Sequence, residues 1–341
     1  MKILLRGDGN DIIGYGHVYR LLALADILKD KFEIVFAICA PSAQLAQTVK
    51  NYCAELIELP LFEHYTLPAF KKNNEEVPFD IADYLSGIDI VVLDGYWFGP
   101  LYQQAVKNTG VKLVCIDDFA ENYFFADAVI NHAPGLDSAK YKGEPYTKYF
   151  LGLDYALLRK DFFRPFTNKR TGRSLFLNLG GTDTYDLTPK LLESAMRSSL
   201  FNTIYFLAPV AYTSEHLHRM EKIANETNKQ LVTKSNMQAA ALVELMDSCD
   251  YALVSASTIL LECYSRRITC FTGYYTSNQL NIYNGFIGEK RAIGLGDLRA
   301  IETTGFDQDG SLFNLTEEIN KPANPLNAPY NLNHLFTQLI L

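Results

Sequence analysis

The sequence predicts an α/β protein built from two Rossmann-like lobes, and three observations lead to this prediction. Short apolar runs alternate with stretches of helical period, which is typical of a parallel sheet flanked by helices. This alternation stops near residue 131 and starts again at residue 174. A chain of 341 residues also has the length of roughly two ordinary domains.

The first series of apolar runs predicts the strands of an N-terminal lobe. These runs occupy residues 2–6, 33–39, 88–93, 111–116 and 128–131. Residues 132–173 are rich in Tyr, Lys, Gly and Pro and end in a charged run, so the boundary between the lobes is expected there. We assign residues 1–160 to this lobe.

A second series of runs predicts a C-terminal lobe over residues 173–320. Its expected strands are residues 174–179, 203–207, 230–233, 251–255, 269–272 and 292–295. Residues 321–341 form a tail in which residues 332–341 are expected to be a short final helix.

Composition argues against several classes of partner. The chain has 31 Lys and Arg against 39 Asp and Glu, a net charge of −8, so a basic nucleic-acid surface is not expected. No apolar run approaches the roughly 20 residues of a membrane span. The first residues lack the long apolar region of a signal peptide, so a cytoplasmic protein is expected. The six cysteines form no CxxC pair, so we expect reduced core thiols and no structural zinc.

A glycine-rich loop follows the first predicted strand. It contains Gly14, Tyr15 and Gly16 and leads to His17, at the start of a predicted helix. Ligands of open α/β sheets bind beyond the carboxyl ends of the strands, and glycine lets the backbone approach them. We therefore expect this loop to face an anionic or polar ligand. The glycine spacing does not match a dinucleotide fingerprint.

His17 is the best candidate for a reactive group. An imidazole has an ordinary pKa of about 6.5 and can act as a general base near neutral pH. The alternative is a histidine that only hydrogen-bonds the loop. His132, which follows another strand, is a second and weaker candidate.

A glycine-containing loop and a helix start in the C-terminal lobe are candidate phosphate sites. Gly180, Gly181 and Thr182 follow the first strand of this lobe, where their backbone amides can line the edge of the sheet. Ser257 and Thr258 form the turn into a helix after the strand at 251–255 and are good N-cap residues. The amides behind them can hold a diphosphate without lysines.

Further along this lobe, Glu262 lies one turn into the same helix, where its carboxylate can accept hydrogen bonds from both ribose hydroxyls. Simple complementation of the helix dipole is the alternative role for Glu262. Asn278 and Gln279 begin another helix, and amides there can contact phosphate or sugar.

Seven motifs, taken in order along residues 2–295, resemble the family of UDP-2,4-diacetamido-2,4,6-trideoxy-β-L-altropyranose hydrolases of pseudaminic acid biosynthesis. The motifs are Gly14-Tyr15-Gly16-His17-x-x-Arg20, Asp94-Gly95-Tyr96, Ile116-Asp117-Asp118, Tyr155-Ala156-Leu157-Leu158-Arg159, Gly180-Gly181-Thr182-Asp183, Ser255-Ala256-Ser257-Thr258 with Glu262, and Asn278-Gln279.

The resemblance implies a GT-B fold, with two Rossmann-like lobes and a cleft between them, and a UDP-sugar as substrate. His17 would activate water for attack at the anomeric carbon with inversion, and UDP would leave by C–O cleavage. Without a metal or cofactor, substrate would be bound by the loop before His17, by Arg20 and by the C-terminal motifs. Asp94 and Tyr96 would face the sugar, Glu262 the ribose, and Asn278 and Gln279 the diphosphate or the sugar.

One departure from the family pattern affects the sugar side. Gly95 stands where a bulky residue, usually histidine, is expected, and Trp97 and Phe98 follow it. The exact hexose is therefore less constrained than the reaction. A GT-B glycosyltransferase and a nucleotide-sugar-binding protein without catalysis remain the alternative functions.

Overall fold

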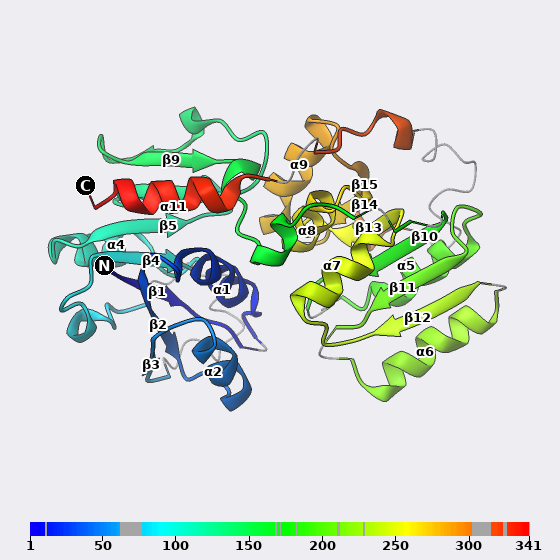
Figure 1. The fold of residues 1–341 in the computed structure, drawn as a ribbon, viewed down its shortest axis with the longest axis horizontal. Coiled ribbons are helices and arrows are strands. Elements are labelled where there is room, and N and C mark those ends of the chain that lie inside the picture. The colour runs from blue at the N-terminus through cyan, green and yellow to red at the C-terminus, as the bar shows by residue number, and fades with distance from the viewer. Residues whose placement is uncertain are drawn as a thin grey trace. The chain divides into compact units, whose positions relative to one another are not determined.

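The computed structural model describes residues 1–10, 12–61, 77–167, 169–170, 172–181, 183, 185–209, 212–227, 229–301, 315–322 and 326–340. The chain divides into two compact units (Figure 1). Unit 1 comprises Met1–Lys160 and Asn327–Leu341, and unit 2 comprises Asp161–Leu326.

Within the described residues, unit 1 contains a seven-stranded parallel sheet in the order β3-β2-β1-β4-β5-β7-β9. The strands are β1 (Lys2–Gly7), β2 (Glu33–Cys39), β3 (Glu55–Leu59), β4 (Ile90–Asp94), β5 (Lys112–Ile116), β7 (Ala128–Asn131) and β9 (Lys148–Leu151). A separate parallel pair joins β6 (Tyr123–Phe124) to β8 (Lys142–Gly143). The central strands are buried on both faces, as parallel strands between helix layers must be.

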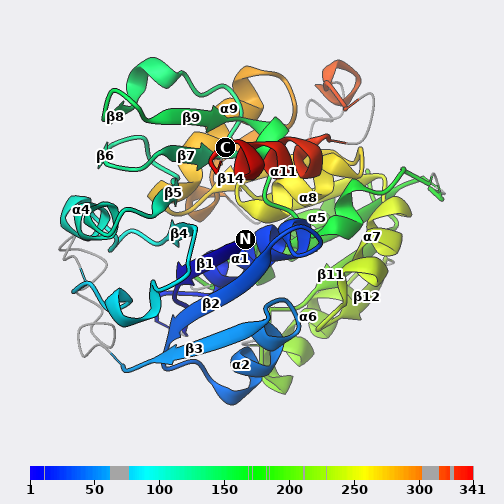
Figure 2. The ribbon, with the colours of Figure 1, turned by 60° about the vertical axis from the view of Figure 1, so that its left-hand side comes forward.

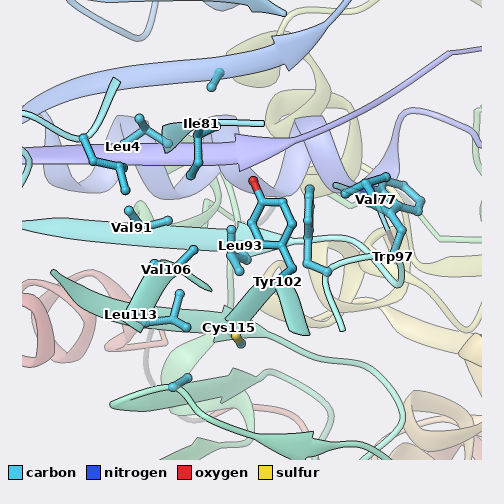
Figure 3. Close-up of a cluster of buried hydrophobic side chains, with 14 of the residues drawn as sticks. Leu4, Val77, Ile81, Val91, Leu93, Trp97, Tyr102, Val106, Leu113 and Cys115 are labelled. Atoms are coloured by element: carbon cyan, nitrogen blue, oxygen red, sulfur yellow. The ribbon is translucent and has the colours of Figure 1, made fainter. Parts of the chain in front are cut away.

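One face of this sheet carries an apolar core of unit 1. Figure 3 shows Leu4, Val91 and Leu93 of β1 and β4 gathered with Tyr102 and other buried side chains of the same cluster. The helices of unit 1 are α1 (Gly16–Leu28), α2 (Ala43–Lys50), α4 (Pro100–Asn108) and α11 (Ala328–Gln338). Tyr102 belongs to α4, so this helix covers the core.

Helix α11 belongs to unit 1 although it lies at the end of the chain (red in Figures 1 and 2). It packs against α1 and the short 3-10 helix Leu153–Tyr155. Asn331 and Asn333 donate hydrogen bonds to the carbonyls of Asp154 and Ile27. The helix starts before residue 332, where the sequence predicted its start.

Unit 2 contains, among the described residues, a six-stranded parallel sheet in the order β12-β11-β10-β13-β14-β15. Its strands are β10 (Ser174–Asn178), β11 (Thr203–Leu207), β12 (Gln230–Lys234), β13 (Tyr251–Ser255), β14 (Thr269–Tyr274) and β15 (Ile293–Asp297). The helices are α5 (Thr188–Arg197), α6 (Ser214–Asn225), α7 (Ala239–Asp247), α8 (Thr258–Ser265) and α9 (Leu280–Gly288). Leu175, Leu177 and Phe206 lie in the core of this unit.

Each predicted strand corresponds to a strand of the structure, but β3, β9 and the short pair β6 and β8 were missed. Strands β3 and β9 lie at the two edges of the unit 1 sheet. Glu55 and Glu58 of β3 are exposed, and β9 lies inside the polar segment that was expected to be the boundary. Edge strands keep charged side chains toward water, so they lack the apolar run that marks a central strand.

A buried arginine attaches the segment after Lys160 to unit 2. Arg266 forms a bidentate ion pair with Asp247 at 2.8 Å from both Nε and Nη2. The same guanidinium donates to the carbonyls of Phe162, Arg164 and Pro165. The described residues between 161 and 172, which the predicted ranges left outside both lobes, belong to unit 2.

Candidate active site

The carboxyl ends of β1, β4 and β5 meet at one edge of the unit 1 sheet, because these strands are parallel neighbours. Gly7 ends β1 and the glycine loop follows it, Asp94 and Tyr96 lie at the end of β4, and Asp118 follows β5. Polar and charged side chains from separate parts of the sequence thus meet where parallel α/β sheets bind ligands.

Glycines allow α1 to approach the end of β1 closely. A Cβ on Gly7 would lie 2.5 Å from Cδ1 of Leu21 and 3.0 Å from the carbonyl oxygen of Asp94. A Cβ on Gly9 would lie 2.9 Å from a methyl carbon of Val18. The missing side chains let the first turn of α1, which carries His17, lie against the end of β4.

His17 is hydrogen-bonded to Asp94. Nδ1 of His17 lies 2.7 Å from Oδ1 of Asp94, and Asp94 is fully buried. Burial by itself raises the pKa of Asp94, but Arg20 and His17 outweigh burial and hold that pKa below its ordinary value. An ionised carboxylate only accepts hydrogen bonds, so Nδ1 of the neutral imidazole must donate. The lone pair of His17 is therefore on Nε2.

Arg20 joins Asp94 to a second aspartate. It donates to Asp94 through Nε at 2.8 Å and Nη2 at 2.7 Å. It also donates to Asp118 through Nη1 at 2.5 Å and Nη2 at 3.2 Å. Although burial lowers the pKa of Arg20, the attraction of Asp118 and Asp94 exceeds it and holds the pKa well above its ordinary value. Both carboxylates and the guanidinium therefore stay charged near neutral pH.

Aromatic rings surround the imidazole. Tyr96 donates its hydroxyl to Asp118 at 2.7 Å, and its ring meets His17 edge-on at 4.7 Å between centroids. The Trp97 ring meets His17 at 5.4 Å. A Cβ on Gly95 would lie 2.7 Å from Cε2 of Trp97, so glycine is needed here for the indole to pack. Tyr96 is 40% exposed whereas Trp97 is 5% exposed, so Tyr96 is the aromatic side chain that reaches solvent.

The structure brings together four of the predicted residues of unit 1: His17, Arg20, Asp94 and Tyr96. Asp94 was expected to face the sugar, but it is buried behind His17 and both of its oxygens are engaged. Arg20 was expected to bind substrate, and its guanidinium is occupied by the two aspartates. Asp118 was not predicted as a site residue, although its place directly after a strand was the signal that would have identified it.

The predicted loop residues precede these side chains. Gly14 has a φ of +83°, and its amide donates to the carbonyl of Asn10 at 2.8 Å. Tyr15 occupies the N-cap position of α1, and Gly16 is its first residue. The loop is thus folded back on itself before the helix that carries His17.

His132, the weaker candidate, is buried at the end of β7. Burial, together with the charge of Arg20, lowers its pKa to about 4 against the opposing pull of Asp118 and Asp94. Its Nδ1 accepts a weak hydrogen bond from the Leu157 amide at 3.4 Å, so Nε2 carries the proton of the neutral ring. Among the described residues, Nε2 of His132 has no partner.

At the sheet edge of unit 2, the loop after β10 is braced from neighbouring strands. Gly180 has a φ of +108°, which favours glycine, and its amide donates to the Asn178 side chain at 2.9 Å. Ser255 and Tyr275 donate their hydroxyls to the carbonyl of Leu179 at 3.1 and 2.8 Å. A Cβ on Gly181 would meet no atom within 4 Å. Thr182 lies outside the described residues.

Helix α8 begins at Thr258, and Ser257 occupies its N-cap position without a side-chain capping bond. Ser257 therefore stands at the predicted N-cap position, but its Oγ lies 3.0 Å from Oγ of Ser255. In the part of the chain that the structure describes, no N-cap side chain covers the positive end of this helix dipole. Glu262 lies in the second turn and is 7% exposed.

The last two predicted residues interact within their own loop. Gln279 is buried, and its Oε1 accepts the Tyr275 amide at 2.9 Å. Oδ1 of Asn278 accepts the Thr276 hydroxyl at 2.6 Å. The Gln279 side chain therefore braces the turn after β14, and the backbone amides of this turn are the groups that the sequence suggested as contacts for phosphate or sugar.

In the described ranges, no group of three or more His, Cys, Asp or Glu side chains is arranged to hold a metal ion. None of the helices in the described part of the chain has the length and apolarity required to span a bilayer.

No protein-family model matches the chain. Solved structures of the same fold do cover nearly all of it. MurG of Acinetobacter baumannii aligns with a TM-score of 0.67 at 12% identity, over 99% of this chain and 100% of that one. The glycosyltransferase VinC, solved with dTDP, gives 0.61 at 11% identity over 100% and 98%. The protein therefore has the GT-B fold, which confirms the predicted fold class.

The chain is a homologue of the UDP-2,4-diacetamido-2,4,6-trideoxy-β-L-altropyranose hydrolase of Campylobacter jejuni, at 22% identity over 82% of this chain and 93% of the relative. The spore coat polysaccharide biosynthesis protein SpsG of Bacillus subtilis is 24% identical over 89% and 86%. An uncharacterized protein of Methanocaldococcus jannaschii is 26% identical over 84% of this chain, which spans only 58% of that relative. These relatives confirm the resemblance to this hydrolase family.

Proposed function

We propose that this chain hydrolyses a UDP-linked diacetamido-trideoxyhexose to UDP and free sugar, as a step of nonulosonic (pseudaminic) acid biosynthesis. The observation that carries the proposal is the hydrogen bond between His17 and Asp94, because it leaves a basic nitrogen at the ligand-binding edge of a GT-B lobe. The homology to the Campylobacter jejuni hydrolase supplies the substrate class.

In the proposed reaction, Nε2 of His17 takes a proton from water as the water oxygen bonds to the anomeric carbon. The bond between that carbon and the diphosphate oxygen breaks, and UDP leaves with the electron pair. Attack from the face opposite UDP inverts the anomeric centre. Asp94 keeps the imidazole in the correct tautomer and stabilises the imidazolium that forms.

The remaining residues of unit 1 divide into two roles in this proposal. Tyr96 and the backbone of Gly14, Tyr15 and Gly16 contact the sugar, since they are the parts of the predicted site that are not fully buried. Arg20 and Asp94 do not contact substrate and instead hold His17.

We assign UDP binding to the sheet edge of unit 2. The uncapped start of α8 at Ser257 and Thr258, together with the amides of Gly180 and Gly181, would hold the diphosphate through backbone N–H groups. This arrangement suits a chain with a net charge of −8, since it needs no basic patch. Glu262 would accept hydrogen bonds from the ribose, and the turn containing Asn278 and Gln279 would contact phosphate or sugar through its backbone.

The test is to incubate the protein with UDP-2,4-diacetamido-2,4,6-trideoxy-β-L-altropyranose in ¹⁸O-labelled water and to follow UDP release. We expect UDP without label and free sugar carrying ¹⁸O at its anomeric carbon, with inverted configuration in the first product seen by NMR. Label in the UDP would contradict C–O cleavage, and no release at high protein concentration would rule out hydrolysis of this substrate.

The same assay separates the two alternatives. UDP release that depends strictly on an added acceptor would identify a glycosyltransferase, the activity of VinC among the structural neighbours. Calorimetric binding of a UDP-sugar that NMR finds intact after long incubation would identify a binding protein.

A further inference from the structure

Five side chains at the sheet edge of unit 1 form a closed ring of interactions. His17 bonds to Asp94, Asp94 to Arg20, Arg20 to Asp118, and Asp118 to Tyr96. The Tyr96 ring then returns to His17 at 4.7 Å. We propose that Asp118 is a positioning residue for His17, acting through Arg20 and Tyr96 to keep the imidazole oriented and able to take up a proton.

The charge of Asp118 affects proton uptake by His17. The ring contains two carboxylates and one guanidinium, so it carries a net charge of −1 while the imidazole is neutral. Proton uptake by His17 makes the whole ring neutral. If Asp118 were uncharged, Arg20 would cancel Asp94, and the imidazolium would form with Nη2 of Arg20 only 3.5 Å from its Nδ1. Like charges at that distance oppose each other, so Asp118 is the group that offsets Arg20.

Asp118 also fixes the orientation of the side chains around His17. Arg20 uses one side of its guanidinium for Asp94 and the other for Asp118, with Nη2 shared. A planar fork held on both sides cannot rotate, so Asp94 keeps its own position. The hydroxyl bond from Tyr96 to Asp118 fixes the aromatic wall beside the imidazole in the same way.

The charged and titratable groups around His17 come from four elements. Asp94 and Tyr96 come from the end of β4, Arg20 from α1, and Asp118 from the loop after β5. His132 at the end of β7 interacts electrostatically with Arg20, Asp118 and Asp94, but it is neutral near pH 7 because burial lowers its pKa to about 4. Asp118 is thus the carboxylate that remains to balance Arg20.

The experiment compares Asp118→Asn, Asp118→Glu and a matched control, Asp127→Asn. Asp127 accepts from Lys107 at 2.6 Å and from the Leu113 amide at 2.8 Å, at the opposite ends of the strands. For Asp118→Asn we expect kcat to fall about tenfold to a hundredfold, and the acid limb of kcat/KM to move to lower pH by about one unit. Asp127→Asn should leave both unchanged.

Asp118→Glu keeps the charge but displaces it. We therefore expect a lower kcat, with the acid limb of kcat/KM unmoved. If Asp118→Asn does not fold, the kcat of Asp118→Glu tests whether Asp118 positions His17. Wild-type kcat in Asp118→Glu, or an unmoved acid limb in a folded Asp118→Asn protein, would overturn the proposal.

The kinetic readout rests on the proposed hydrolysis, so a second readout is independent of it. In protein labelled with ¹⁵N-histidine, the ring signals of His17 are assigned by their loss in His17→Gln. Their titration midpoint should move to lower pH in Asp118→Asn, whether or not the protein cleaves a UDP-sugar. A moved midpoint without any hydrolysis would refute the proposed function and leave the role of Asp118 standing. An unmoved midpoint would refute that role.

Discussion

Asp94 and His17 are separated by 77 residues in the chain, yet Oδ1 of Asp94 lies 2.7 Å from Nδ1 of His17. Because Asp94 is buried, ionised and held by Arg20, this hydrogen bond sets the tautomer of the imidazole. The pair also explains why glycine occupies position 7, since any side chain there would push α1 away from the end of β4.

The first prediction concerns His17 itself. His17→Ala removes the proposed base, so kcat for UDP release should fall about a hundredfold to ten-thousandfold. The affinity for UDP, measured by titration calorimetry, should change little, because UDP binding is assigned to unit 2. His218→Ala, at an exposed position on α6, is the control. Near-normal kcat in His17→Ala would remove His17 from the mechanism.

The second prediction concerns Asp94. An asparagine at this position can offer an N–H to Nδ1, which would move the proton of His17 to Nε2 and abolish its lone pair there. We expect kcat to fall by about a thousandfold to ten-thousandfold for Asp94→Asn, with UDP affinity unchanged. A folded Asp94→Asn protein with more than about a tenth of normal kcat would contradict the tautomer argument.

The third prediction concerns the pH dependence of stability. His132 has a folded-state pKa of about 4, below the 6.5 of a free histidine, so the unfolded chain binds a proton first as pH falls. Its contribution to the free energy of unfolding is therefore constant above about pH 6.5 and decreases down to about pH 4. Near pH 5 the loss should be about 2 kcal/mol relative to pH 7.

Urea denaturation of the wild type and His132→Gln at the two pH values measures this effect. The variant should lose about 2 kcal/mol less between pH 7 and pH 5, whatever its absolute stability. His218→Gln, which changes an exposed histidine, should follow the wild type. Equal pH dependence in the wild type and His132→Gln would show that His132 does not carry the effect. Folding lowers the pKa values of Asp94 and Asp118, so the stability that these two carboxylates contribute is lost only below about pH 4.

The fourth prediction concerns Glu262. If its carboxylate accepts hydrogen bonds from the ribose, Glu262→Gln should weaken UDP binding by about tenfold, since bonds to charged groups contribute about 1.5–3 kcal/mol. The variant should also lose the preference of the wild type for UDP over 2′-deoxy-UDP in titration calorimetry. Glu193→Gln, on the surface of α5, provides the matched control. An unchanged preference would assign Glu262 to the helix dipole alone.

The fifth prediction concerns the packing of Gly95 against Trp97. A methyl group at position 95 would lie 2.7 Å from Cε2 of Trp97, so Gly95→Ala should destabilise unit 1 by about 1–3 kcal/mol. Trp97 is the one tryptophan of the chain, so its fluorescence reports directly on this site. We expect a red-shifted emission and a lower urea midpoint.

Gly288→Ala is the control for Gly95→Ala, because a Cβ there meets no atom within 4 Å. It lies in α9 and should leave the Trp97 emission unchanged. Wild-type emission and stability in Gly95→Ala would mean that the indole can move without cost.

The sequence predicted most strands because the signal for a central strand is local. Residues 3–5 of β1 and residues 252–254 of β13 are fully buried, and each run is apolar without interruption. Glu55 and Glu58 interrupt the apolar run of β3, so this strand was not predicted. The sequence at the end of the chain did not indicate that α11 packs against α1. The apolar periodicity of a helix indicates that one of its faces is buried, but it does not indicate which surface that face packs against.

The candidate site was also predicted from the sequence only in part. From the sequence alone, the glycine loop, His17 and the positions after each strand were predicted to lie at a ligand-binding edge, because parallel strands place their carboxyl ends together. Only the tertiary structure decided that Asp94 holds His17 and that Arg20 is shared with Asp118, a residue 98 positions away. The geometry of a hydrogen bond depends on how α1 packs against β4 and β5, and no local pattern of residues records that packing.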